Sequence, residues 1–253
     1  MNYPIYHNKA LVWSDEFEGN NLDYSKWECA VDAFGGGNNE LQIYTDDPRN
    51  VRVENSMLIL EAHQGGAVAG TTRPFSSGKV RSKHRGDWTH GLFEVRAKLP
   101  IGRGLWSAIW MLPTDEIYGG WAASGEIDIM EARGHLPREI CAAIHYGGAW
   151  PHNKIYPSDE LGAGKFYCDY FHTFALDWTK DLMVWLIDGI PCWSASRDTS
   201  WGRHDTDENI TAPFDQRFHL LLNLAVGGRF PGPPDMHTRF PARMEIDWVR
   251  VWQ

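Results

Sequence analysis

The segment Leu182-Met-Val-Trp-Leu-Ile-Asp-Gly-Ile-Pro-Cys-Trp193 contains two apolar runs separated by Asp188-Gly189. The first run, Leu182 to Ile187, is apolar on both faces. Asp-Gly supplies the positive φ angles that a tight hairpin needs, and the chain then returns from Ile190 to Trp193. The segment therefore predicts an antiparallel pair of strands.

The rest of the chain has the same short-strand character. Residues 93–99 and 173–178 alternate apolar with polar side chains, which predicts strands with one face in water. Residues 106–112 and 218–226 are apolar on both sides, as expected for strands in the middle of stacked sheets. We find no long amphipathic helix, repeat or interdomain linker, so we predict one domain over residues 1–253, an all-β, two-sheet antiparallel β-sandwich with a concave cleft.

Composition limits the classes of partner. The formal net charge of −9 and the pI of about 5.6 offer no general attraction to nucleic acid or to anionic lipid. No apolar run approaches the roughly 20 residues of a membrane span, and residues 1–10 lack the features of a signal peptide. We expect no nucleic-acid or membrane partner.

The tryptophans and cysteines are less decisive. The 13 Trp residues exceed the need of one core, and flat rings stack well on sugars, although about half are expected to pack in the core. The four cysteines form no CxxC pair, so they are read as buried thiols or one optional bridge. The cysteines do not show whether the protein works in a reducing or an oxidising compartment. The four are Cys29, Cys141, Cys168 and Cys192.

The sharpest chemical signal is Gly125-Glu-Ile-Asp-Ile-Met-Glu131, in which three carboxyls alternate with branched apolar residues. In a strand, Glu126 and Asp128 share one face. Strict alternation would put Met130 on that face in place of Glu131. A one-residue β-bulge at Ile129-Met130 would restore Glu131 to it, and we predict this bulge.

Two carboxyls about 5–5.5 Å apart are the geometry of retaining glycosidases, in which one attacks the anomeric carbon and the other protonates the leaving oxygen. Crowding three acids also raises the pKa of at least one of them, which keeps a general acid protonated near neutral pH. The alternative is an exposed strand edge whose acids are only solvated.

Several further stretches resemble the laminarinase-like branch of glycoside hydrolase family 16 over nearly the whole chain. They are Leu11-Val-Trp-Ser-Asp-Glu-Phe17, Leu22-Asp-Tyr-Ser-Lys-Trp27, Gly35-Gly-Gly-Asn-Asn-Glu-Leu-Gln42, Gly91-Leu-Phe-Glu-Val-Arg-Ala-Lys-Leu99, Ala108-Ile-Trp-Met-Leu-Pro113 and Glu245-Ile-Asp-Trp-Val249, together with the Gly125 to Glu131 motif. The resemblance implies a concanavalin A-like jelly roll. It also implies that Glu126 is the nucleophile, Glu131 the acid/base and Asp128 their electrostatic partner.

The resemblance also implies residues that bind the substrate. Asn39 and Arg81 would donate hydrogen bonds to glycone hydroxyls, and His145 and Asn223 would lie beside the scissile bond. The stacking walls would be Trp106, Trp110 and Trp121. Other readings stay open, because Arg81 could only pair with an acid, His145 could be a satisfied sheet histidine and Trp110 could be core.

Family members often bind a structural calcium ion, through a C-terminal aspartate and backbone oxygens. By resemblance these positions are Asp247, Glu16 and Ser56, with waters completing the shell. No cofactor is expected to be required for catalysis. The run Ile140 to Tyr146 departs from the family pattern, because Ala143 replaces the expected partner of His145, and contacts with the leaving group around Trp150 could differ.

The resemblance implies endo-acting, retaining hydrolysis of β-1,3-glucan polysaccharides or oligosaccharides, with mixed β-1,3-1,4-glucan as a further substrate. The alternatives are a galactan hydrolase or transglycosylase of the same family, and a β-glucan-recognition protein without catalysis. Retention of all three acids argues against the last. We also expect a monomer that is extracellular, its signal peptide not being part of this sequence.

Overall fold

The computed structural model describes residues 8–65, 72–158, 160–161, 165–201 and 212–253, and these residues form β-strands and loops with no α-helix. None of the described segments forms a helix that could cross a membrane. The cysteines of the sequence are all free thiols. The prediction of an all-β chain is confirmed.

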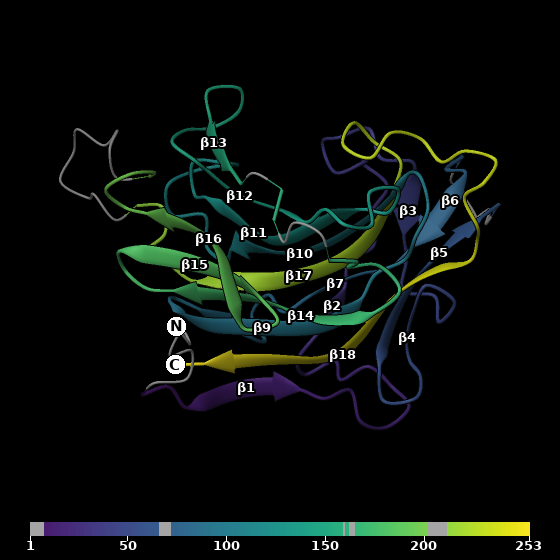
Figure 1. Ribbon diagram of the computed structural model, residues 1–253, viewed down its shortest axis with the longest axis horizontal. Helices are drawn as coiled ribbons and strands as arrows, with labels where there is room; N and C mark the ends of the chain where they lie inside the picture. Colours follow the sequence, from purple (N-terminus) through teal and green to yellow (C-terminus); the bar gives the residue numbers. More distant parts are fainter. Residues whose placement is uncertain (1–7, 66–71, 159, 162–164, 202–211) are drawn as a thin grey trace.

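One sheet has ten strands (Figure 1). Its order is β16 (Ile190–Ser196), β15 (Leu182–Ile187), β14 (Phe171–Trp178), β9 (Gly91–Lys98), β18 (Ala242–Trp252), β5 (Leu58–Gln64), β6 (Phe75–Ser77) and β3 (Gln42–Tyr44), with β1 (Leu11–Asp15) beside β18 and β4 (Val51–Val53) beside β5. All its pairs are antiparallel except β3 with β6, which is parallel.

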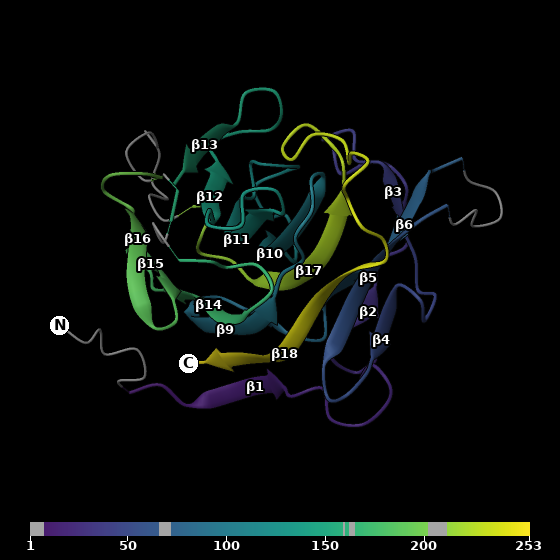
Figure 2. The same ribbon diagram turned by 45° about the vertical axis from the view of Figure 1, so that its right-hand side comes forward.

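The second sheet has eight strands and carries the acidic motif. Its order is β13 (Lys154–Pro157), β12 (Cys141–Tyr146), β11 (Glu126–Arg133), β10 (Leu105–Pro113), β17 (Phe218–Val226), β7 (Lys79–Arg81) and β2 (Glu28–Cys29), with β8 (Asp87–Trp88) beside β17. The two sheets stack as layers, most plainly where β10, β11 and β17 lie over β9 and β14 (Figures 1 and 2). The predicted sandwich is confirmed.

The hairpin that the sequence predicts is present. Asp188 and Gly189 have φ angles of 51° and 72°, as the tight turn requires, and β15 pairs with β16 on either side of them. The core lies between the sheets and includes Ile109, Met111 and Ile127 from the eight-stranded sheet. Side chains that alternate with these therefore face away from the other layer.

The prediction that residues 93–99 and 173–178 each have one face in water holds for Arg96 and Lys98, whose side chains are 38% and 30% exposed, but fails at Glu94 and Asp177. Glu94 and Asp177 lie on the polar face of these strands, yet each is only 4% exposed. Trp252 donates to Glu94 and Lys9 pairs with Asp177, so chain ends cover this face and satisfy its carboxylates.

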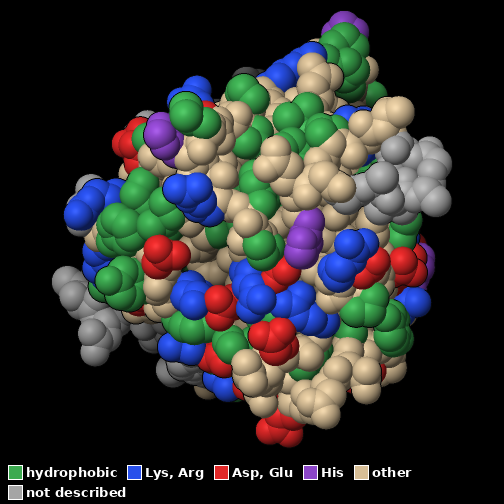
Figure 3. All heavy atoms as spheres, turned by 90° about the vertical axis from the view of Figure 1, so that its right-hand side faces the viewer, with side chains coloured by type: hydrophobic (Ala, Val, Ile, Leu, Met, Phe, Trp, Pro, Cys, Tyr) green, Lys and Arg blue, Asp and Glu red, His purple; other side chains and the backbone are tan. Residues whose placement is uncertain are grey.

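Charges of both signs are interspersed on the molecular face that Figure 3 presents, toward β3 to β6. Among the ion pairs of β4, β5 and β18, Arg243 contacts Glu54 and Glu61, and Arg52 contacts Glu61 at 2.9 Å. Because the two signs compensate one another here, this face offers no strong field to a charged polymer.

Candidate active site

The predicted bulge lies in β11. Asp128 is opposite Trp110 and Glu131 is opposite Ala108, so three steps along β11 correspond to two along β10. The pairing with β12 shifts over the same segment, which contains Ile129-Met130. Because residues two apart on a regular strand share a face, Glu131 lies on the face of Asp128. The bulge is confirmed.

A buried tryptophan of the other sheet contacts this bulge. Trp185 of β15 donates from Nε1 to the backbone oxygen of Asp128 at 3.0 Å. The bulge disrupts the ladder locally, so a side-chain donor that reaches a backbone acceptor there stabilises the irregular segment.

Rows of cross-strand neighbours extend from the acids over the outer face of the eight-stranded sheet, at right angles to the strands. Neighbours in a row point to the same side of a sheet. The two rows are Asp128, Trp110, Leu221 and Arg81, and Glu131, Ala108, Asn223 and Lys79. Predicted catalytic and binding residues thus share one surface.

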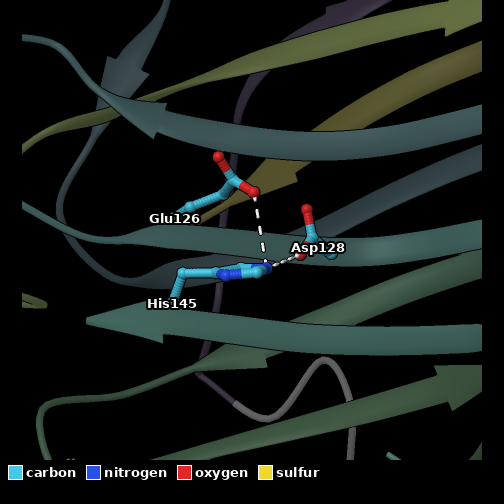
Figure 4. Close-up of side chains that lie close together, drawn as sticks. All are labelled: Glu126, Asp128 and His145. Atoms are coloured by element: carbon cyan, nitrogen blue, oxygen red, sulfur yellow. Dashed lines mark ion pairs between the residues drawn. The ribbon is translucent and has the colours of Figure 1, made fainter. Parts of the chain in front are cut away.

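His145 lies between two of the acids (Figure 4). Its Nε2 is 3.2 Å from Oδ2 of Asp128 and 3.6 Å from Oε1 of Glu126. The other oxygen of Glu126, Oε2, accepts a 2.7 Å hydrogen bond from Nε1 of Trp121. Both oxygens of Glu126 therefore face groups that stabilise its anionic form.

Glu131 has a separate donor. Nε1 of Trp106 donates to its Oε1 at 3.1 Å. Trp106 is 9% exposed, so this predicted stacking residue is mostly buried, with its N–H turned to the acid. The main role of Trp106 is therefore to position Glu131, because little of its ring is accessible for stacking on a sugar.

Burial raises the pKa of Glu126, Asp128 and Glu131, each to about 8. Repulsion from the charge of Asp128 adds to the effect of burial on both glutamates, while His145 opposes it. Three desolvated carboxyls on one face cannot all ionise near neutral pH. The site therefore holds a proton that a general acid can deliver.

A chain of buried hydrogen bonds supports the middle of the site. Trp110 donates to Oδ1 of Asn223 at 2.7 Å, and Asn223 donates to the hydroxyl of Tyr44 at 3.0 Å. Tyr44 in turn lies 3.5 Å from Glu40, which also accepts from Gln42 at 2.6 Å. Sequence reasoning missed this role of Tyr44, although the spacing of residues 40, 42 and 44 places them on one strand face.

Arg81 and Asn39 lie toward the far end of the sheet from His145. Arg81 donates two hydrogen bonds to the carboxylate of Glu28, at 3.0 and 3.2 Å. The structure therefore shows the alternative interpretation, in which Arg81 pairs with an acid. Asn39 is exposed in the loop between β2 and β3, with a φ of 59°. Its polar side chain is accessible from solvent.

Two exposed tryptophans lie beside Glu126. Trp121 is 40% exposed and Trp150 is 67% exposed, with ring centroids 6.1 Å apart. The ring centroids of Trp121 and His145 are 5.5 Å apart. The backbone N–H of Trp150 donates to the backbone carbonyl of Trp121. The pair presents apolar ring surface next to the carboxyls.

The predicted calcium ligands lie elsewhere. The Asp247 carboxylate is paired with Arg96, and the side chain of Glu16 is paired with Arg250. Ser56 has a φ of 56° in the turn between β4 and β5. A cation here would take backbone oxygens of Glu16 and Ser56 but would compete with Arg96 for Asp247. Calcium binding stays a prediction.

Known proteins that are similar to this chain belong to the family that its motifs resemble. Residues 38–250 match the family model described as glycosyl hydrolases family 16. Over 264 residues the chain is 38% identical to glucan endo-1,3-beta-glucosidase A1 of Niallia circulans, covering 99% of this chain but only 39% of that protein. It is 39% identical over 256 residues to glucan endo-1,3-beta-glucosidase of Cryptopygus antarcticus, covering 96% and 92%.

A solved structure is similar throughout. The catalytic domain of an endo-1,3-beta-glucanase (laminarinase) from Thermotoga petrophila RKU-1 superposes with a TM-score of 0.86 at 34% identity, over 97% of this chain and 98% of that one. The likeness therefore includes both sheets of the sandwich and the strands that carry the acids.

Proposed function

Because the chain belongs to glycosyl hydrolases family 16, we propose that it hydrolyses β-1,3-glucan at internal linkages, with retention of anomeric configuration. Glu126 is the nucleophile, Glu131 the acid/base, and Asp128 the residue between them. The relatives named above support this substrate class.

In the first step the carboxylate of Glu126 attacks the anomeric carbon while Glu131 gives its proton to the departing glycosidic oxygen. In the second step Glu131, now ionised, takes a proton from water, and the water oxygen displaces Glu126. Burial raises the pKa of both glutamates, and the N–H of Trp121 and the ring of His145 stabilise the anion at Glu126, which leaves Glu131 to hold the proton.

The observation that carries the proposal is the bulge in β11, which turns Glu131 to the face of Glu126 and Asp128. Without the bulge, strict alternation would direct the side chain of Glu131 into the core. Retaining chemistry needs the two glutamate carboxyls about 5–5.5 Å apart, and placement on one face is the condition for that approach.

The substrate would cross the sheet along the rows of neighbours, with Arg81 and Asn39 toward one end and Trp121 with Trp150 toward the other. A β-1,3-glucan is uncharged, which suits an acidic protein. Aromatic rings give the stacking surface that sugars use. Mixed β-1,3-1,4-glucan has the same chemistry at each anomeric carbon and is a second substrate to test.

Glu126→Gln tests the proposal. This variant should fold and bind laminarin, yet lose turnover by on the order of 10⁴-fold or more, because an amide is not a nucleophile. Glu116→Gln, at an exposed position, is the matched control and should keep activity. Substantial hydrolysis of laminarin by Glu126→Gln would overturn the assignment. Azide should rescue Glu131→Ala, since a small anion needs no general base.

A glucan-recognition protein without catalysis is the second candidate, and a galactan hydrolase or transglycosylase the third. The presence of all three acids on one face favours an enzyme over a recognition protein. Reducing-end and product analysis on laminarin, lichenan, agarose and carrageenan separates the three, because binding without product identifies the second and products from galactans identify the third.

We also propose that calcium binds through Asp247 and backbone oxygens of Glu16 and Ser56 as a stabilising ion. A cation that binds only the folded state raises its melting temperature. Calcium should therefore raise the melting temperature of the EDTA-treated protein, and Asp247→Ala should remove that response. An equal response in both proteins would exclude this position.

A further inference from the structure

The side chains of Glu126, Asp128 and His145 form a cluster that is also suited to a metal ion. One ligand atom from each lies within 4.8 Å of the others, and none of the three atoms belongs to the backbone (Figure 4). The donors are two carboxylate oxygens and one imidazole nitrogen, Nε2 of His145. Imidazole with carboxylate is the donor set of zinc and its neighbours, whereas calcium and magnesium take oxygen alone.

The two distances from the histidine fit a tetrahedral ion. Bonds of about 2.0–2.1 Å at tetrahedral angles place ligand atoms about 3.3–3.4 Å apart. Nε2 of His145 lies 3.2 Å from Asp128 and 3.6 Å from Glu126. The two carboxylate oxygens lie within 4.8 Å of each other, so the carboxylates must move closer together to bind a small ion, a movement that the charge of a dication favours.

Access and charge also favour an ion at this position. The side chains of Glu126, Asp128 and His145 are 14%, 6% and 16% exposed, so the cluster is mostly desolvated yet reachable from the outer face. Two acids crowded in that setting repel one another when ionised, and a dication between them removes the repulsion. Three protein ligands would leave a fourth position for water, as in open zinc sites.

We propose that this cluster is an inhibitory binding site for Zn²⁺ and similar transition-metal ions. A bound ion occupies both the Glu126 oxygen that faces His145 and the carboxylate of Asp128, so substrate and metal exclude one another. The three ligand atoms must be free of protons before they can bind the ion. Binding therefore releases protons and tightens as pH rises.

The metal site is tested by titrating the full chain with Co²⁺ at neutral pH and following its visible absorption, then displacing it with Zn²⁺. One ion per chain is expected, with intense tetrahedral bands, unaffected by excess Mg²⁺. His145→Ala and Glu126→Gln should each weaken binding at least tenfold. His237→Ala, which removes an exposed histidine, should leave it unchanged.

Inhibition is measured separately on the wild type. Zn²⁺ should inhibit laminarin hydrolysis competitively and EDTA should restore it. The proposal fails if Co²⁺ binds His145→Ala as tightly as wild type, if it gives no tetrahedral spectrum, or if inhibition is unaffected by substrate concentration. The absorption readout needs no turnover, so the metal site can stand or fall independently of the proposed glucanase activity, on which only its inhibitory role rests.

Discussion

Nε1 of Trp185 and the backbone oxygen of Asp128 are joined by a 3.0 Å hydrogen bond, which links the ten-stranded sheet to the bulge beneath the acids. Trp185 is 1% exposed, and its Nε1 reaches the backbone of β11 from the side opposite the acids. The geometry of the catalytic strand thus depends in part on a residue of the opposite layer.

Trp185→Phe should lower both stability and turnover. It removes some ring volume and leaves the oxygen of Asp128 without its donor, which together cost about 2–4 kcal/mol. Trp178→Phe is a matched control, because Trp178 is equally buried and its Nε1 has no hydrogen-bond partner among the described residues. Urea denaturation should show a larger loss for Trp185→Phe, and equal losses would contradict a role for the hydrogen bond.

Trp121→Phe should slow the reaction and move its acidic limb. The N–H of Trp121 lowers the pKa of Glu126, opposing the effect of burial, so its removal raises that pKa. Activity needs ionised Glu126, and the acidic limb of the kcat/KM profile should therefore shift to higher pH. We expect about a tenfold loss at the optimum, or about 1.4 kcal/mol.

Trp150→Phe gives the comparison for Trp121→Phe, since Trp150 is exposed and contacts the ring and the backbone carbonyl of Trp121 instead of a carboxylate. Its pH profile should keep the wild-type acidic limb, even where KM changes through weaker stacking. A limb that moves equally in both variants would argue that the ring, and not the N–H, sets the pKa.

The three acids should make the fold less stable as pH rises. Their folded pKa values of about 8 lie above the unfolded values near 4, so the folded state binds more protons between these limits. The resulting stabilisation is complete below about pH 4 and is lost as pH rises to about 8. Each acid contributes a slope of up to about 1.4 kcal/mol per pH unit within this window.

Asp128→Asn should reduce that slope, measured as the change in unfolding free energy from pH 5 to pH 8. Asp198→Asn changes an acid whose side chain is 84% exposed and should retain the wild-type slope. A wild-type protein that gains stability over this window would show that the acids are ionised in the folded state.

Tyr44→Phe should break the buried chain that leads from Glu40 to Trp110. Asn223 and Glu40 would each lose a partner away from water, at a cost of about 1–3 kcal/mol in unfolding free energy. Because Asn223 then loses its fixed orientation, kcat/KM on laminarin should fall as well. Tyr24→Phe, at a tyrosine that is 63% exposed, should change stability by no more than about 0.5 kcal/mol.

Local pattern predicted much of this molecule. The turn at Asp188-Gly189 requires positive φ, and the bulge in β11 follows from three acids that need one face. Both features depend on neighbours in sequence. Contacts between distant segments were not predictable in the same way, since nothing near Asp128 identifies Trp185 as its donor, and nothing near Glu94 shows that Trp252 covers it.

The site shows the same division. The spacing of Glu126, Asp128 and Glu131 singled them out, and the family resemblance gave their roles. The pairing of Arg81 with Glu28 and the role of Tyr44 depend instead on strands 53 and 179 residues away in the chain. Sequence could offer the acid-paired arginine only as an alternative, because β2 and β7 become neighbours only when the sheet closes.

The irregular segment of β11 has a consequence for length variation. Removing one residue between Asp128 and Glu131 would abolish the irregularity and leave acid, apolar, acid, apolar, acid in plain alternation, with all three acids still on the outer face of the sheet. A shortened relative would therefore preserve both the orientation of its proton donor and its separation from the nucleophile, because the bulged segment already spans only two positions of β10. Indels that ordinarily invert a strand would here leave both direction and spacing intact.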